Sequence, residues 1–115
     1  MSDIFHFDPP MNQSQAYGYI IPEKDGVIEL TIEAGHEGNN HDTPWASVDI
    51  IVNKDIPEDE VRILHRRTAW QNGAFLFKAS EPMNVRGGRV YKIYGFSENQ
   101  NARSTSIKLS AKRLA

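Results

Sequence analysis

The sequence contains no cysteine, which excludes a disulfide framework and thiolate chemistry. It also lacks any run of the roughly 18 apolar residues that a membrane-spanning helix needs, so we expect no membrane insertion. The formal net charge is only −2, and no overall field therefore attracts nucleic acid or an anionic membrane. These absences argue against thiol enzymes, membrane-spanning proteins and nucleic-acid-binding proteins.

The sequence motifs of common enzymes are absent as well. The chain has no G-x-S-x-G nucleophile elbow, no Walker A loop and no G-x-G-x-x-G motif. A Ser-His-Asp set can be assembled from Ser47, His41 and Asp42, but any chain with four histidines allows such a choice. Paired carboxylates for glycoside hydrolysis need a deep cleft, which a sandwich of this size has little material to form. We therefore expect a protein that is not an enzyme.

The first residues, MSDIFHFDPP, contain no basic segment followed by an apolar one, so a Sec-type signal peptide is not expected. This predicts a cytoplasmic protein, or one secreted by another route. Residues 1–15 are predicted to form an extended arm, because Pro9 and Pro10 prevent a helix from continuing. The arm either adds a strand to its own sheet or reaches a neighbouring subunit, and we expect a homo-oligomer.

The rest of the chain is a series of short alternating segments. A length of 115 residues indicates one domain, which we place at 16–115. In VIELTIEA, from residue 27 to 34, apolar and polar residues alternate strictly, as in a strand buried on one face. Strands are expected at 16–21, 27–34, 47–53, 61–70, 74–79, 89–96 and 105–111. About seven short, mostly antiparallel strands predict a single all-β sandwich of immunoglobulin-like or jelly-roll type.

Residues 55–67, DIPEDEVRILHRR, allow two interpretations. Acids near the start, Pro57 and the arginines at the end are typical of a helix. The Asn72-Gly73 pair instead favours a hairpin turn, which needs a strand before it. Helix and strand both stay open at this stage.

Alternating strand directions would gather the connections at two ends of the sandwich. One end would hold the connections 22–26, 54–60 and 80–88, and the other would hold 35–46, 70–73 and 97–104. The second end is rich in amide groups and carries both tryptophans. Amides both donate and accept hydrogen bonds, and tryptophan offers a large flat apolar surface. Such a surface suits the hydroxyls and the C–H face of a sugar.

The sequence thus predicts non-catalytic, lectin-like binding of a glycan or glycoconjugate through this end. The expected ligand-binding residues are His36, Glu37, Asn39, Asn40, His41, Asp42, Trp45, Trp70, Asn72, Asn99 and Asn101. For each residue a structural role is the competing interpretation, since asparagine and glycine commonly form turns. The alternative function is a structural or assembly protein, such as a coat, virion or toxin-complex component, that contacts proteins through its arm and loops.

No cofactor is predicted, and calcium is kept as a metal candidate. His36, Glu37, His41, Asp42 and His65 offer zinc ligands, but their spacing matches no standard zinc pattern. Calcium prefers six to eight oxygen ligands. Acids are expected at the opposite end of the sandwich, at Glu23, Asp25, Asp55, Glu58, Asp59, Glu60 and Glu81. No EF-hand pattern is present among them.

Overall fold

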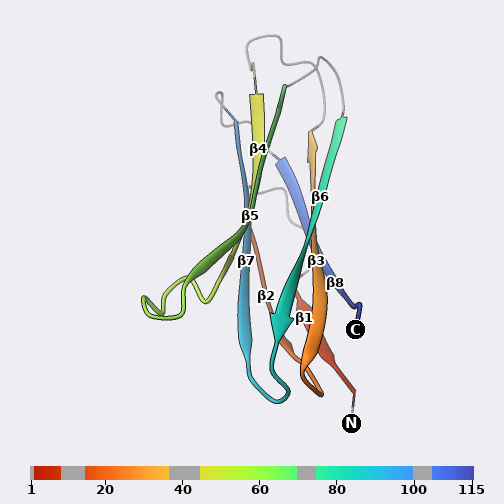
Figure 1. Cartoon of the computed structure of the whole chain (residues 1–115). Helices are drawn as coiled ribbons and strands as arrows, with labels where there is room; N and C mark the ends of the chain where they lie inside the picture. Colours follow the sequence, from red (N-terminus) through yellow and green to blue (C-terminus); the bar gives the residue numbers. More distant parts are fainter. Residues whose placement is uncertain (1, 9–14, 37–44, 70–74, 100–104) are drawn as a thin grey trace.

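The computed structural model describes residues 2–8, 15–36, 45–69, 75–99 and 105–115. Within these ranges every regular element is a β-strand, and the strands form two antiparallel sheets packed face to face (Figure 1). The strands are β1 (Ile4–Phe7), β2 (Gln15–Ile21), β3 (Gly26–His36), β4 (Trp45–Val52), β5 (Val61–Ala69), β6 (Phe75–Val85), β7 (Tyr91–Asn99) and β8 (Thr105–Arg113). The expected all-β sandwich is confirmed. The part of the chain described contains no helix that could cross a membrane.

One sheet has five strands in the order β1-β2-β7-β4-β5, and the other has three in the order β6-β3-β8. Their inner faces meet in a core of aliphatic side chains, because the apolar residues of each strand alternate toward the opposite sheet. Members of this core are Ile28, Leu30, Ile32 and Ala34 of β3, Val48, Ile50 and Val52 of β4, and Ile107 and Leu109 of β8. The alternation expected from the sequence is confirmed at these positions.

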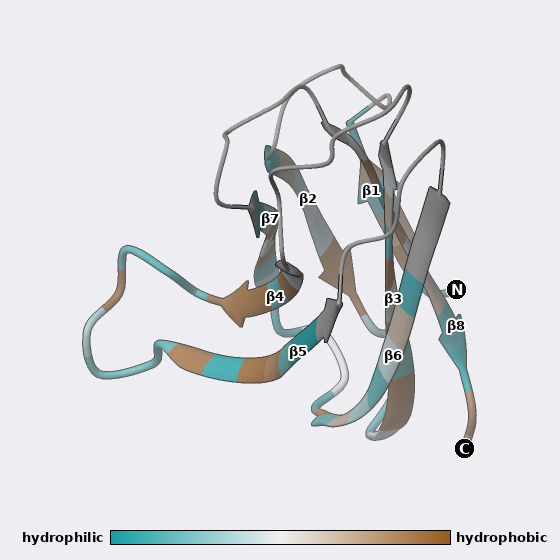
Figure 2. Ribbon diagram, turned by 90° about the horizontal axis from the view of Figure 1, so that it is seen from above, coloured by the Kyte–Doolittle hydropathy of each residue, from teal (hydrophilic) through white to brown (hydrophobic). Residues whose placement is uncertain are grey.

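Residues 55–67 contain no helix. Residues 53–60 make turns, and β5 then pairs with β4 from Val61↔Val52 to Ala69↔Trp45. The strand alternative is therefore confirmed, because the sheet supplies hydrogen-bond partners to this backbone. The hairpin expected from Asn72-Gly73 is wrong, however, because β5 pairs with β4 in the five-stranded sheet and β6 pairs with β3 in the other sheet. Seen from above, β5 and the 53–60 connection extend away from the three-stranded sheet (Figure 2).

Most strands are longer than expected, and β6 and β7 extend into segments that were expected to be connections. β6 continues to Val85, although residues 80–88 were expected to form a connection. Pro82 lies inside β6 opposite Glu29. Proline has no backbone N–H to donate, and this is tolerated because β6 is an edge strand with one unpaired side. β7 likewise continues to Asn99, so residues 97–99 belong to the strand rather than to the polar connection.

The two expected ends of the sandwich can be traced. At one end the three connections touch: the Gly88 N–H donates to the Pro22 carbonyl at 2.8 Å, and Arg89 Nη2 lies 3.4 Å from Asp59 Oδ1. At the other end β3 stops at His36 while β4 begins at Trp45 (Figure 1). The connections 37–44, 70–74 and 100–104 lie outside the described residues.

Residues 4–7 of the expected arm belong to the five-stranded sheet. β1 pairs with β2 from Ile4↔Ile21 to Phe7↔Gly18. Phe5 packs against the core. Both chain ends lie on the same side of the molecule in Figure 1.

Candidate functional site

The sequence-predicted ligand residues are only partly described. His36, Trp45 and Asn99 lie at strand ends, where Ala46 pairs with Asn99 and His36 pairs with Thr105. Their side chains are outside the described part of the structure, as are Glu37, Asn39, Asn40, His41, Asp42, Trp70, Asn72 and Asn101. Glycan binding at this end therefore stays a prediction.

A second surface, not expected from the sequence, lies on the outer face of the five-stranded sheet. Tyr17 of β2 is opposite Tyr94 of β7 in the antiparallel register, so both rings project from the same face. Their ring centroids are 4.9 Å apart, and those of Tyr94 and Phe96 are 5.3 Å apart. These three rings, which we call the aromatic row, cross from β2 to β7.

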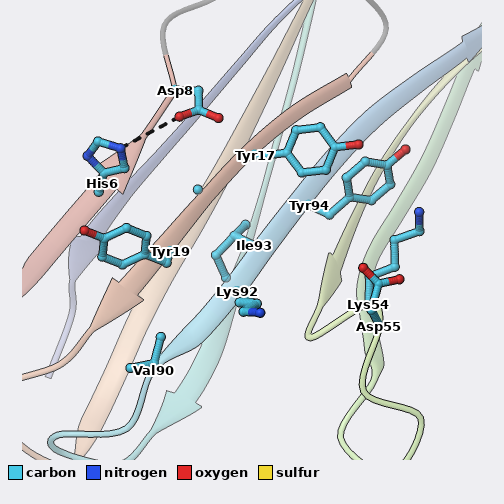
Figure 3. Close-up of a pocket in the computed structure, with 11 residues that line it drawn as sticks. His6, Asp8, Tyr17, Tyr19, Lys54, Asp55, Val90, Lys92, Ile93 and Tyr94 are labelled. Atoms are coloured by element: carbon cyan, nitrogen blue, oxygen red, sulfur yellow. Dashed lines mark ion pairs between the residues drawn. The ribbon is translucent and has the colours of Figure 1, made fainter.

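β1 extends this surface beyond the aromatic row. The His6 ring stacks on Tyr19 with centroids 5.1 Å apart and an interplanar angle of 28°. His6 Nε2 lies 3.8 Å from Asp8 Oδ1 (Figure 3). The close approach of β1 requires glycine at position 18, where a Cβ would overlap the side chain of Phe7.

A hollow of about 460 Å³ lies over these residues, and we call it the tyrosine hollow. Tyr17 and Tyr19 stand along β2 within it, while Lys54 and Asp55 enter from the 53–60 connection (Figure 3). Its lining residues are His6, Asp8, Tyr17, Gly18, Tyr19, Lys54, Asp55, Val90, Lys92, Ile93 and Tyr94. The size is within the range of small-ligand sites, roughly 300–1,000 Å³.

A second hollow of about 340 Å³, the phenylalanine hollow, lies farther along the same face. Its lining residues are Gln15, Ile51, Lys54, Arg62, Tyr94, Phe96, Ser97 and Glu98. Gln15 Oε1 accepts a hydrogen bond of 3.0 Å from the Tyr17 hydroxyl. The amide, guanidinium and carboxylate groups around Phe96 thus place donors and acceptors beside an aromatic ring.

Asn53 positions the lysine between the two hollows. Its backbone is left-handed, with φ of 56°, and its N–H donates to the Lys92 carbonyl at 2.8 Å. Its Oδ1 accepts from the Lys92 N–H at 3.0 Å. The chain leaving β4 is thereby fixed against β7, and Lys54 Nζ lies 4.5 Å from the Tyr94 ring centroid, a cation–π contact.

A buried carboxylate supports the arginine of the phenylalanine hollow. Asp49 has only 2% of its side chain exposed, and its Oδ1 lies 2.5 Å from His65 Nδ1 and 3.4 Å from Arg62 Nη1. A buried charge needs such partners to be stable. The Arg62 guanidinium carbon is 6.0 Å from the Phe96 ring centroid. Asp49 therefore orients Arg62 beside the ring.

The surroundings of Tyr94 disfavour ionisation of its hydroxyl. Burial raises the pKa of Tyr94 above its ordinary value of 10.0, and the nearby Tyr17 and Glu98 raise it further. Like other tyrosine hydroxyls at neutral pH, it can donate as well as accept a hydrogen bond.

The end of the sandwich that holds residues 22–26 and 54–60, where most of the acids were expected, forms no metal site among the residues described. No three histidine, aspartate or glutamate side chains are grouped there to hold an ion. Several acids instead have protein partners: Asp25 Oδ1 accepts from the Gly87 N–H at 2.8 Å, and Glu81 Oε2 lies 3.1 Å from Arg66 Nη2. Of the five residues considered for zinc, His65 pairs with Asp49, and the other four side chains are not described.

Comparisons with known proteins bear on the fold alone. No protein-family model matches the chain, and neither does any curated protein. A solved structure of Eiger TNF from S. frugiperda is similar, with a TM-score of 0.54 and 10% sequence identity over 85% of this chain. The fold resembles that of a TNF jelly roll. This chain spans 65% of the length of the TNF structure, and the low identity carries no information about a ligand.

The aromatic row had a signal in the sequence. In YGYI, from residue 17 to 20, the two tyrosines alternate with Gly18 and the buried Ile20. In YKIYGF, Tyr94 and Phe96 alternate with the buried Ile93 and Gly95. Period two therefore places both aromatic pairs on outer faces. What the pattern does not reveal is that β2 and β7 are neighbours.

Proposed function

We propose that this protein binds carbohydrate without chemically converting it, and that the outer face of the five-stranded sheet holds the sugar. The observation that carries the proposal is the exposure of Tyr17 and Tyr19, 48% and 38% respectively, beside a hollow with polar groups around it. An exposed flat ring can receive the C–H face of a sugar. Large exposed aromatic surface combined with placed polar groups is typical of a binding site.

The polar groups match sugar hydroxyls, which both donate and accept. Gln15 offers an amide and Lys54 offers up to three N–H donors. Asp55 and Glu98 offer acceptors at the edges of the two hollows. Asp49 already contacts His65 and Arg62. It therefore does not contact the sugar and instead holds Arg62 in place beside Phe96.

A glycan array and sugar-affinity columns test the proposal. We expect retention on at least one glycan, and loss of retention in Tyr17→Ala. Leu114→Ala is the matched control, because Leu114 is equally exposed at 48% and does not line either hollow. Unchanged circular dichroism shows that each variant is folded. If the unmodified protein binds no glycan, the proposal fails.

Absence of catalysis is tested on the same glycans. The bound oligosaccharide is incubated with the protein and analysed by mass spectrometry. We expect it to be recovered intact, and a shortened product that the Tyr17→Ala variant does not form would identify an enzyme instead.

Assembly of a homo-oligomer is the competing proposal, with β1 exchanged between copies. The observation in its favour is that β1 lies at the edge of its sheet, where strands readily pair with other chains. An exchange would have to break the contact of Asp3 with Arg113 as well as the β1–β2 pairing. Sedimentation that shows only monomer at micromolar concentration would exclude it. Sugar binding itself fits either a cytoplasmic location or secretion without a Sec-type signal.

A further inference from the structure

The tyrosine hollow and the phenylalanine hollow adjoin, because Lys54 and Tyr94 line both of them. We infer that together they form one groove that takes an extended, electrically neutral glycan several sugar residues long, rather than a single terminal sugar. This inference rests on the proposed function and specifies the class of its ligand.

The length of the groove follows from the strands that it crosses. The groove begins at His6 on β1 and reaches Arg62 on β5. β1 and β5 are the two edge strands of the five-stranded sheet. Neighbouring strands lie about 4.8 Å apart, so the four steps between β1 and β5 span roughly 19 Å. This span is several times the width of one sugar ring, and a monosaccharide would occupy only one part of it.

The aromatic rings are distributed along the groove rather than gathered at one point. In the β2–β7 register Tyr19 pairs with Lys92, Tyr17 with Tyr94 and Gln15 with Phe96, so Tyr19, Tyr17 and Phe96 follow one another along these strands. The groove therefore crosses the sheet diagonally, from His6 beside Tyr19 to Arg62 near Phe96. Each ring offers a separate apolar contact, and successive sugars of an extended chain present successive C–H faces. The arrangement suits repeated contacts with one chain.

Lys54 lies where the two hollows meet. Its Nζ lies above the nearly buried Tyr94 ring, and within the described ranges no carboxylate pairs with it. The ammonium group is therefore available to donate hydrogen bonds to hydroxyls of a sugar in the middle of the chain.

The charges along the groove favour a neutral ligand. Lysine and arginine side chains are matched in number by carboxylates: Lys54, Lys92 and Arg62 against Asp8, Asp55 and Glu98. A chain of uronic acids would meet these carboxylates as well as the cations, so the repulsion from one set offsets the attraction to the other. A neutral chain meets no such repulsion.

The inference is tested by titration calorimetry with four neutral series, the cello-, xylo-, chito- and malto-oligosaccharides, each from the monosaccharide to the hexasaccharide. Oligogalacturonate of matched length is the acidic comparison. We expect at least one neutral series to bind with an affinity that rises about tenfold or more from monosaccharide to tetrasaccharide. Added salt is expected to change this affinity little, because the ligand carries no charge.

Variants at the two ends test whether one chain spans the groove. Tyr19→Ala and Phe96→Leu are each expected to weaken tetrasaccharide binding about tenfold and to affect the disaccharide less. Phe96→Leu keeps an apolar side chain, so the sheet stays packed, and Leu114→Ala is again the control. If one end variant leaves tetrasaccharide affinity unchanged in a folded protein, the groove is not continuous.

The outcomes separate the inference from the proposed function. If a monosaccharide binds as tightly as its tetrasaccharide, the extended-chain inference is wrong while sugar binding stands. If oligogalacturonate binds more tightly than every neutral series, the neutral class is wrong. If no saccharide binds, the proposed function itself fails.

Discussion

Arg113 holds Asp3 through two parallel hydrogen bonds, from Nε to Oδ2 and from Nη2 to Oδ1, each 2.8 Å long. The Glu23 N–H also donates to Asp3 Oδ1 at 2.8 Å. Asp3 immediately precedes β1, and Arg113 is the last residue of β8. The pair therefore fastens the strand that carries His6 to the opposite sheet.

Stability should fall in acid through this pair. The hydrogen bonds from Arg113, followed by the one from the Glu23 N–H, lower the pKa of Asp3 from 3.8 to about 2. Because the pKa is lower in the folded state, the stabilisation is complete above pH 3.8 and is lost as the pH falls toward 2. Between pH 3.8 and pH 2 the unmodified protein should therefore lose more stability than the Asp3→Asn variant does, as measured by thermal unfolding. If the melting temperatures of the two proteins fall equally over this pH range, Asp3 is not the source of the acid sensitivity.

Asn53 should tolerate glycine better than alanine. Asn53→Ala loses the hydrogen bond to the Lys92 N–H and places alanine in a left-handed conformation that asparagine tolerates better, at a combined cost of about 2 kcal/mol. Asn53→Gly relieves the backbone part of this cost, so its loss is expected to be smaller. Urea unfolding measures both variants. Equal losses would show that the backbone conformation contributes nothing.

Ser97 is a site where a substitution should stabilise the fold. Its side chain is 3% exposed, and among the residues described its Oγ has no hydrogen-bond partner. Ser97 is paired with Val48, whose buried apolar side chain offers the hydroxyl no hydrogen-bond partner. Ser97→Ala removes this unsatisfied group and is expected to raise the free energy of unfolding by about 1 kcal/mol. A loss of that size in chemical denaturation would mean that Oγ has a partner.

The Asp49 cluster should respond unequally to removal of its members. The double variant His65→Ala, Arg62→Ala leaves Asp49 buried without either partner, and the expected loss is about 3 kcal/mol or more. Asp49→Asn leaves the half-exposed Arg62 and His65 side chains in contact with solvent, so its loss is expected to be smaller. Equilibrium unfolding of both proteins in urea compares them. The reverse order would show that Asp49 does not depend on these partners.

The fold class followed from local patterns in the sequence. Alternation in β3 and β8 identified inward residues such as Ile32 and Leu109, which are buried as expected. The strand expected at 61–69 is confirmed over the helix indicated by Pro57, but the hairpin that supported it does not form, because β5 and β6 belong to different sheets. Boundaries were less accurate, because extension of β6 through Pro82 depends on its position at a sheet edge.

The candidate site depended on information that local patterns do not contain. Tyr17 and Tyr94 are far apart in the sequence and meet only because β2 is paired with β7. Asp49 and His65 meet because β4 and β5 are paired in one particular register. The order of strands is set by the packing of the whole core. Loop composition was visible in the sequence, and it drew attention to one end of the sandwich rather than to the outer face of the five-stranded sheet.

The basic side chains of β5 have a consequence for how molecules meet one another. β5 is an edge strand, and Arg62, His65, Arg66 and Arg67 all lie along it with exposed side chains. An exposed edge would otherwise act as a template on which another copy could add its own strand and begin a fibril. Two such edges brought together would set arginine against arginine, so this rim of the sheet should resist fibril growth even in concentrated solution.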